Sequence, residues 1–357
     1  MENLDNGTFL LSREDADRLA SLRIGGKAEV ALGGNRVTLA LQPADVHTAA
    51  ELPTYLSGYK PAAFRADEVS QPILVDNDMG LRRDFSALDA FLIVDPRVST
   101  SAAIQEIDPI SAVLPYTVRD RCLGSFVPVQ TELQQSSMQP RMVAGARAMK
   151  GIQLFREQEV MALIGLNTSW AAANRIALVG GEEWGVNPAP AGAASNPIAA
   201  IERGIELSAQ PVTDIWFNEA VAHAFLKHPE VRDHMRQMLG DAGFSNLKSM
   251  DDFIIPGLPT FHISRSKFQA TAAGARGYCL PSTCCVLICK TAGEPRGGEE
   301  IASTYTFRRK GPSGTGITVR EYFVDGRGSL GGTMIAVTQA DDVQMVGTIA
   351  GAHIAGV

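Results

Sequence analysis

The sequence contains no run of about 18 apolar residues, the length at which an apolar stretch becomes a candidate transmembrane helix. It also opens without the basic segment and apolar core of a secretory signal peptide. The apolar stretch 345–357 is too short to span a bilayer and is rich in glycine. These absences predict a protein that does not contact a membrane and is made in a cytosol.

The chain also lacks an excess of positive charge. Its 32 Lys and Arg residues stand against 39 Asp and Glu residues, for a net charge of −7. Proteins that bind nucleic acid through a basic surface gain affinity by neutralising phosphates, so this balance argues against that class. The remaining composition is ordinary for a globular protein: 357 residues with 45% hydrophobic residues allow one large or two medium domains.

Cysteine is too scarce for a disulfide framework, because only five are present and four of them lie between Cys279 and Cys289. This odd number fits a reducing compartment. Two interpretations of the group remain open. The segment CCVLIC is apolar on both faces, which favours inert thiols in a buried strand. The alternative is a thiol or metal enzyme centred on the group, which metal analysis would decide.

Motifs for nucleotide binding and catalysis are absent as well. The sequence has no GxGxxG and no GxxxxGK[ST], and His223 and His228 are wrongly spaced for a zinc-protease pair. The acidic pairs at 182–183 and 251–252 have no recognisable partner base or nucleophile. The sequence therefore predicts no catalytic residues, no cofactor and no metal, and a protein that is not an enzyme.

The most distinctive feature that is present is the segment 140–167, PRMVAGARAMKGIQLFREQEVMALIGLN. It begins with a proline, contains no other, and is rich in good helix formers, so it predicts one long helix. Its apolar residues do not fall on one clean stripe, which favours a spine contacted from several sides. An ordinary core helix of a large domain is the alternative.

The regions on either side of this helix differ in character. Residues 1–70 are poor in core-forming residues and offer a short helix after Ser12 and a hairpin in 25–43. Residues 95–133 predict two extended stretches joined by a polar excursion. Short strand-like runs precede them, PILVD and DAFLIVD.

After the long helix, capped helices are expected at Asn196-Pro197 and Asn218, and another helix, PEVRDHMRQML, closes at Gly240. Strands dominate the last third, including GITVREYFV, GGTMIAVT and VQMVGTIAGAHI. Helices and strands do not alternate as repeated βαβ units, so the expected fold class is α+β.

Several phrases in this order resemble the major capsid proteins of tailed double-stranded DNA bacteriophages, which have the HK97-type fold. The resemblance runs from about residue 72 to the C terminus. It is carried by FVPVQTELQQSSMQP with LFREQEVMALI, by SNPIAAIERGIELSAQPVTDIWFNEAVAHAFLKHPEVRDHM, and by VREYFVDGRGSLGGTMIAVTQADDVQMVGTIAGAHIA.

The resemblance implies the following domains: an N-terminal arm (1–70); a peripheral domain (71–194) with an extended E-loop (about 95–133) and a spine helix (about 140–166); an axial domain (195–275); and return strands of both domains (276–357). It also implies that the arm is ordered only in the assembled shell, because its sequence has too few apolar residues to offset its ordering entropy alone.

The function implied is structural, without catalysis. Pentamers and hexamers would self-assemble into the icosahedral head of a virion, made in the cytoplasm of a bacterial host. The implied partners are further copies of the chain, a portal protein, a scaffold or decoration protein, and packaged DNA bound without sequence specificity. An encapsulin-like cellular shell around a protein cargo is the alternative.

Four charged residues of the extended loop are candidates for contacts between subunits. Arg119 and Arg121 are expected to meet acidic groups of a neighbour, and Glu106 and Asp108 to meet basic ones. Solvated charges on an exposed ribbon are the alternative. No lysine occurs between Lys60 and Lys150, so the loop offers no amine for the isopeptide weld that some members of this family use.

Overall fold

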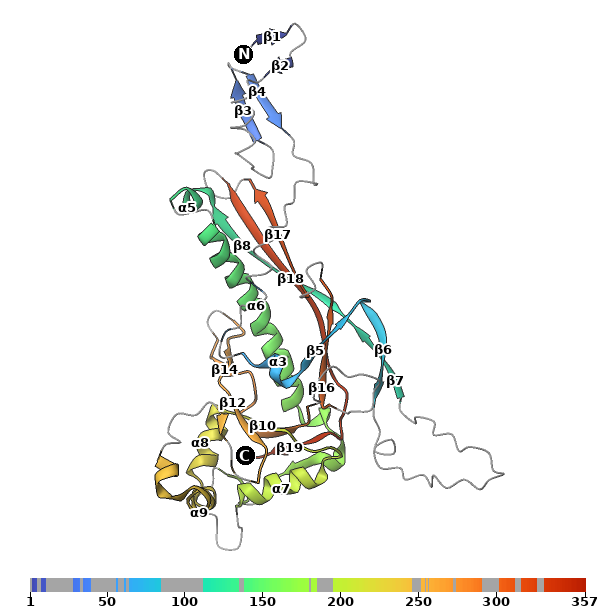
Figure 1. Cartoon of the computed structure of the whole chain (residues 1–357), viewed down its shortest axis with the longest axis vertical. Coiled ribbons are helices and arrows are strands. Elements are labelled where there is room, and N and C mark those ends of the chain that lie inside the picture. The colour runs from blue at the N-terminus through green and yellow to red at the C-terminus, as the bar shows by residue number, and fades with distance from the viewer. Residues whose placement is uncertain are drawn as a thin grey trace, which may run out of the picture. The chain divides into compact units, whose positions relative to one another are not determined.

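The computed structural model describes residues 2–4, 8–10, 28–32, 35–39, 56, 61, 64–84, 112–134, 138–179, 181–184, 195–245, 252–253, 255, 257–271, 274–290, 302–311, 316–325 and 331–357. The chain forms two compact units, whose elements are labelled in Figure 1. The first comprises Met1–Tyr59, Cys122–Met149 and Ile317–Thr338, and the second Lys60–Arg121, Lys150–Gly316 and Gln339–Val357. The helix α6 (Met138–Gly165) and the strand β18 (Gly332–Met345) contribute residues to both. The expected long helix is thus confirmed.

In the first unit, β18 pairs with β17 (Ile317–Val324) and with β8 (Arg119–Pro128), which is followed by α5 (Val129–Gln134). A Cβ atom at Gly332 would lie 2.2 Å from the carbonyl oxygen of Val127. Only glycine therefore allows these two backbones to approach so closely.

The N-terminal segment contains two described antiparallel pairs. They are β1 (Glu2–Leu4) with β2 (Thr8–Leu10), and β3 (Ala28–Leu32) with β4 (Asn35–Leu39). The second pair confirms the hairpin expected in 25–43. The helix expected after Ser12 lies outside the described residues, and so does the strand expected at DAFLIVD.

A six-stranded mixed sheet organises the second unit. Its order is β11-β12-β10-β15-β19-β9, with the following bounds: β11 Asp252–Phe253, β12 Thr260–Ser264, β10 Asp214–Asn218, β15 Cys284–Ile288, β19 Gly351–Ala355 and β9 Arg175–Ala177. The pairs β10–β12 and β19–β9 are parallel and the others antiparallel. This mixture of directions fits the expected α+β class.

Helices α7 (Pro197–Leu207), α8 (Glu219–Lys227) and α9 (Pro229–Ser245) belong to the same unit. The predicted caps are confirmed: Asn196 accepts a hydrogen bond from the amide of Ala199 at 3.1 Å, and Asn218 from that of Val221 at 2.9 Å. The end predicted at Gly240 is wrong, because α9 continues to Ser245. A glycine inside a helix costs only about 1 kcal/mol, which the rest of a 17-residue helix tolerates.

A second set of strands begins with β5 (Gln71–Val75), which pairs in parallel with β16 (Thr304–Arg309). The other edge of β16 pairs with the end of β18 and places Arg308 opposite Asp341. The sequence predicted two strands across this part of β18, one ending near residue 338 and one starting at 343. The structure corrects this to one strand of 14 residues, in which Asp341 is buried.

Before β8, the strands β6 (Met79–Asp84) and β7 (Ala112–Thr117) form an antiparallel ribbon. The remaining short elements are α3 (Ala66–Val69), the 3-10 turns Asn167–Ser169 and Ala172–Asn174, β13 (Lys267–Phe268) and β14 (Gly277–Tyr278). No helix in the described part of the chain is long and apolar enough to cross a membrane.

Candidate functional site

The second-unit half of α6 buries charged residues on its apolar stripe. Ile152, Arg156, Val160 and Ile164 follow one another at four-residue spacing and are all buried. Arg156 is 4% exposed, and the next residue, Glu157, is 0% exposed. The buried stripe of α6 therefore contains charges, which agrees with the prediction that its apolar residues do not form one clean stripe. The sequence analysis did not single out these two residues, although their phase with Ile152 and Val160 is a signal that could have revealed them.

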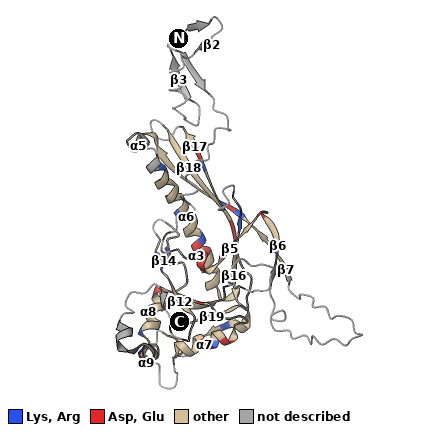
Figure 2. Ribbon diagram, viewed as in Figure 1, with Lys and Arg blue, Asp and Glu red and all other residues tan. Residues whose placement is uncertain are grey.

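Arg156 is the centre of a buried ion-pair network. Its guanidinium pairs with Asp67 of α3, lies 3.3 Å from Asp341 of β18, and donates a hydrogen bond to the hydroxyl of Thr306 at 3.2 Å. Arg308 pairs with Asp67 as well, at 3.3 Å. Burial, and then the neighbouring Arg156, lower the pKa of Arg308 to about 10, so it stays charged at neutral pH. Figure 2 shows these charges by colour along the ribbon.

Arg121 joins the same network from the start of β8. Its guanidinium lies 2.8 Å from Asp341 and 2.5 Å from Glu159, and 5.1 Å from the ring centre of Phe155. The two Asp341 oxygens are at ion-pair distance from arginine nitrogens but not in hydrogen-bond alignment. Their attraction is therefore mainly Coulombic, and it acts in a site shielded from water.

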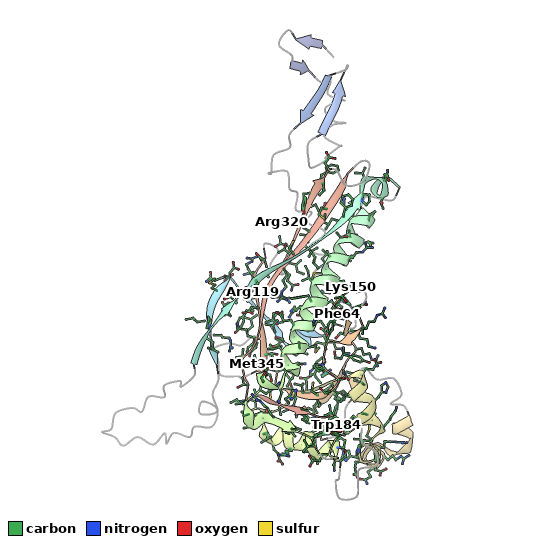
Figure 3. The ribbon with its side chains drawn as sticks, turned by 180° about the vertical axis from the view of Figure 1, so that it is seen from behind. Phe64, Arg119, Lys150, Trp184, Arg320 and Met345 are labelled. Atoms are coloured by element: carbon green, nitrogen blue, oxygen red, sulfur yellow. The ribbon has the colours of Figure 1, made fainter. Side chains whose placement is uncertain are left out.

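The four residues expected to contact a neighbouring subunit have different outcomes. Arg121 does meet acidic groups, but the two described here belong to its own chain. Arg119, labelled in Figure 3, is exposed on β8. Glu106 and Asp108 lie outside the described residues. A contact of any of these four with another subunit stays a prediction.

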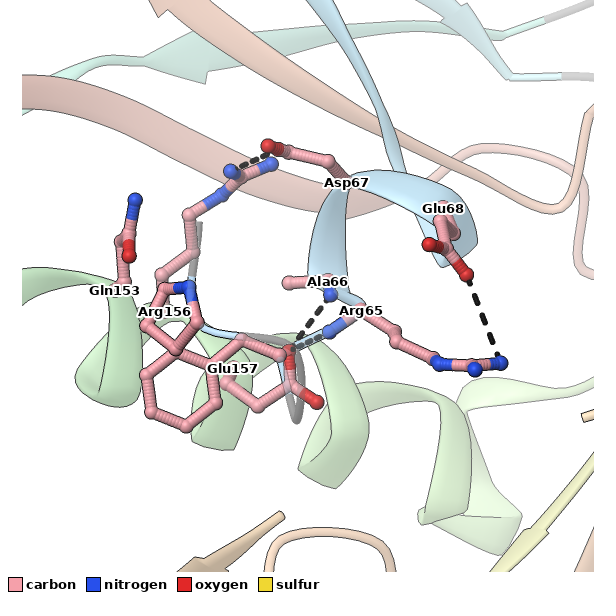
Figure 4. A pocket seen from close by; sticks show the side chains of 9 residues that line it. Arg65, Ala66, Asp67, Glu68, Gln153, Arg156 and Glu157 are labelled. Atoms are coloured by element: carbon pink, nitrogen blue, oxygen red, sulfur yellow. Dashed lines mark hydrogen bonds and ion pairs between the residues drawn. The ribbon is translucent and has the colours of Figure 1, made fainter. Parts of the chain in front are cut away.

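Glu157 fastens the segment before β5 to α6. One carboxylate oxygen, Oε2, accepts hydrogen bonds from the backbone amides of Ala66 at 2.6 Å and Arg65 at 2.9 Å. The other, Oε1, accepts one from the hydroxyl of Ser266 at 2.9 Å. Burial raises the pKa of Glu157 despite these hydrogen bonds. A cavity of about 50 Å³ lies alongside, as Figure 4 shows.

A second polar cluster surrounds Asp214 at the start of β10. Its carboxylate accepts hydrogen bonds from Nε2 of His262 at 2.5 Å, from the hydroxyl of Thr213 at 2.5 Å and from Nζ of Lys290 at 2.9 Å. His262 also stacks on Trp216, with ring centres 4.6 Å apart. Burial alone would raise the pKa of Asp214, but these three hydrogen bonds lower it to about 2.

The buried cysteines have the environment of inert thiols. Cys279, Cys284, Cys285 and Cys289 are at most 3% exposed, which confirms the burial predicted for them. Burial raises the pKa of Cys279 and of Cys289 to about 11 and that of Cys284 to about 12, so these thiols are protonated at neutral pH. Within the described ranges, no group of three or more His, Cys, Asp or Glu side chains could hold a metal ion.

The ribbon β6–β7 has one covered face and one bare face. Directly paired residues share a face, so Leu81 lies beside Pro115, and Met79 lies two residues further along the same face. Met79 is 72% exposed and Leu81 74% exposed. On the opposite face, Tyr116 stacks on Phe307 with ring centres 4.3 Å apart. One face of the ribbon therefore packs on β16 within the second unit, and the other presents adjacent apolar side chains.

Comparison with known proteins gives a likeness in structure only. No family model matches the chain, and no curated protein matches its sequence. A phage-related protein from Bordetella bronchiseptica RB50 is 17% identical, with a TM-score of 0.65 over 87% of this chain and 98% of that one. The capsid protein of a prophage in Escherichia coli CFT073 is 11% identical, with a TM-score of 0.56 over 87% and 99%.

The capsid protein of the cyanophage P-SCSP1u is 9% identical and has a TM-score of 0.51 over 91% of this chain and 96% of that one. The likeness thus extends over nearly the whole of each of these proteins. The chain has an HK97-like capsid fold, as its sequence resemblance predicted.

Proposed function

We propose that this chain is a major capsid protein that assembles, without catalysis, into the icosahedral head of a tailed phage. The observation that carries the proposal is the shared fold, which extends over 96% or more of two capsid chains. Pentamers and hexamers are the assembly units in this proposal, and the virion is the site of action. A portal protein and a scaffold or decoration protein complete its partners.

The parts of the fold take the roles that the resemblance implied. The strands β7 and β8 lie in the extended loop, α6 is the spine helix of the peripheral domain, and α7, α8 and α9 with β10 and β12 belong to the axial domain. The N-terminal segment is the arm, ordered against neighbouring subunits. Because β7 pairs with β6, we include β6 in the stem of this loop, which in this proposal starts at Met79.

The bare face of the β6–β7 ribbon supports assembly through this loop. Met79 and Leu81 expose most of their side chains, and burying a residue of this size stabilises a contact by about 1.5–3 kcal/mol. In this proposal a second copy of the chain covers that face. Because a shell repeats each contact many times, even a modest contribution per copy affects its formation.

The enclosed material in this proposal is double-stranded DNA. The chain carries a net charge of −7, and a shell of such chains does not neutralise phosphates along its inner wall. The genome can then move freely in and out. DNA contacts would be without sequence specificity.

The substitution Leu81→Lys tests the proposal at the ribbon. A charge at a position that is 74% exposed should leave the fold intact but prevent burial against a neighbour. We expect a folded chain, judged by circular dichroism, whose yield of shells in size-exclusion chromatography falls by at least tenfold. The matched control Leu81→Met keeps the apolar character and should assemble normally. Normal assembly of Leu81→Lys would show that no neighbouring copy buries this face of the ribbon.

A further inference from the structure

The segment 64–69, here called the strap, covers the carboxylate of Glu157. Both backbone amides that Glu157 binds, those of Arg65 and Ala66, belong to the strap. Figure 4 shows the carboxylate of α6 directed at these amides. Glu157 has no exposed surface. A buried carboxylate is thus placed beneath a short segment of six residues.

Charged side chains fasten the strap at two further points. Asp67 pairs with Arg156 and Arg308, and a guanidinium nitrogen of Arg65 lies 3.4 Å from Nδ1 of His262. These contacts are side-chain ion pairs and hydrogen bonds. The strap is also held by Ala66 and Val69, which are buried in the apolar core of the second unit.

Water needs little movement of the strap to reach Glu157. The cavity of about 50 Å³ beside the carboxylate is lined by Pro61 and Gln153 as well as by strap residues. A single water needs about 10–15 Å³, so the cavity has room for more than one. The pocket is partly open to solvent, so a small outward movement of the strap would let its water reach the carboxylate.

The closed arrangement accommodates a protonated Glu157. A proton on Oε1 can be donated to the hydroxyl oxygen of Ser266, which in turn can donate to the hydroxyl of Ser264 at 3.1 Å. Oε2 then continues to accept from both strap amides. The ionised carboxylate keeps the same contacts but loses the water that would solvate its charge.

Charged and titratable groups surround Glu157 on every side that packs against it. Arg156 precedes it on α6 and favours the ionised form, and Cys279 lies beyond Ser266. The strap contributes Arg65, Asp67 and Glu68, and His262 of β12 lies beyond Arg65. Burial outweighs the favourable partners and raises the pKa of Glu157.

We propose that the strap is controlled by the proton on Glu157: it lies closed over the neutral acid and opens more readily when the acid is ionised. The strap leads through Ser70 into β5, so its opening would free the start of that strand from α6. This inference does not depend on the proposed function.

The direction of the pH effect follows from linkage. Opening exposes Glu157 to water and returns its pKa to the ordinary value of about 4.3. The closed state therefore binds the proton more tightly than the open state. Between the ordinary and the raised pKa, the opening equilibrium should increase with pH by up to about tenfold per unit. Above the raised pKa it should be constant.

Hydrogen exchange of the purified full-length chain tests this proposal. Protection of a peptide covering residues 64–70 is measured by mass spectrometry from pH 5 to 8 and corrected for the intrinsic pH dependence of exchange. We expect protection in the wild-type chain to fall several-fold as pH rises. In Glu157→Gln it should be independent of pH, and in the control Glu202→Gln, which alters an exposed carboxylate of α7, it should follow the wild type.

A wild-type protection that stays constant or rises with pH would overturn the proposal, as would an unchanged slope in Glu157→Gln. If that variant fails to fold, Ser266→Ala decides the question. It removes the hydroxyl that donates to Oε1 of Glu157 and favours the ionised carboxylate, so the pKa of Glu157 should rise further and the fall in protection should move to higher pH. An unmoved profile in Ser266→Ala would overturn the proposal.

Discussion

At the scale of single residues, paired charges contribute to the stability of the folded state. Asp214 is 6% exposed and accepts three hydrogen bonds, which hold its pKa at about 2. Because this pKa is below the unfolded value, the ionised carboxylate stabilises the folded state at every pH above about 4. That contribution is lost as the pH falls from about 4 through about 2.

We therefore predict that Asp214→Asn lowers the free energy of unfolding by about 2 kcal/mol at pH 7. The difference from the wild type should be much smaller at about pH 2, where about half of the wild-type carboxylate is protonated. Urea unfolding of the unassembled chain at both pH values measures it. An equal difference at both pH values would show that the charge of Asp214 does not contribute.

At this scale the sequence predicts caps but not ion pairs. Asn196 and Asn218 could be identified because an N-cap acts on an amide within three residues. The partners of Glu157 could not be identified, because they are at positions 65, 66 and 266. Which distant backbone amide a carboxylate meets depends on tertiary structure. Periodicity shows only that position 157 lies near an apolar stripe.

At the scale of elements, β18 shows that a strand can continue through a buried charged residue when that residue has charged partners. The pair Asp341-Asp342 lies between the two strands expected from the sequence, yet β18 continues through it. Successive side chains of a strand point to opposite faces, so only one of the two carboxylates enters the network. Asp341 meets Arg121 and Arg156, whereas Asp342 accepts a hydrogen bond from the amide of Thr117 at 3.0 Å.

This arrangement predicts unequal effects of the same substitution at adjacent positions. Asp341→Asn leaves the buried Arg156 and the partly buried Arg121 without their shared carboxylate and should lower the free energy of unfolding by about 3 kcal/mol. Asp342→Asn keeps an acceptor oxygen for Thr117 and should lower it by less than about 1 kcal/mol. Urea unfolding of the two variants compares them. Equal losses would mean that the network around Arg156 does not stabilise β18.

Elements with strong local signals were predictable, and those that depend on distant partners were not. The helix α6, the hairpin β3–β4 and the strand β15 all follow from composition and periodicity. The pairing of β6 with β7 does not, because the two strands are separated by residues 85–111. Neither strand alternates cleanly between apolar and polar residues, so the sequence does not identify a bare outer face.

For the molecule as a whole, the order of elements carried more information than any motif. An arm, an extended loop, a long helix, an α/β region and C-terminal strands together resembled one capsid fold, and the structural likeness confirms that fold. Composition alone could not have identified this fold, since it is ordinary for a globular protein. The fold alone does not determine what a shell encloses, so the assembly itself is the central claim to test.

Electron microscopy of the purified full-length chain tests that claim most directly. The account predicts closed icosahedral particles of uniform diameter, built from many copies of the chain. Particles isolated from the producing cell should contain double-stranded DNA. A folded chain that remains monomeric or forms only small oligomers would contradict the account, and shells filled with a protein cargo would contradict its assignment to a phage head.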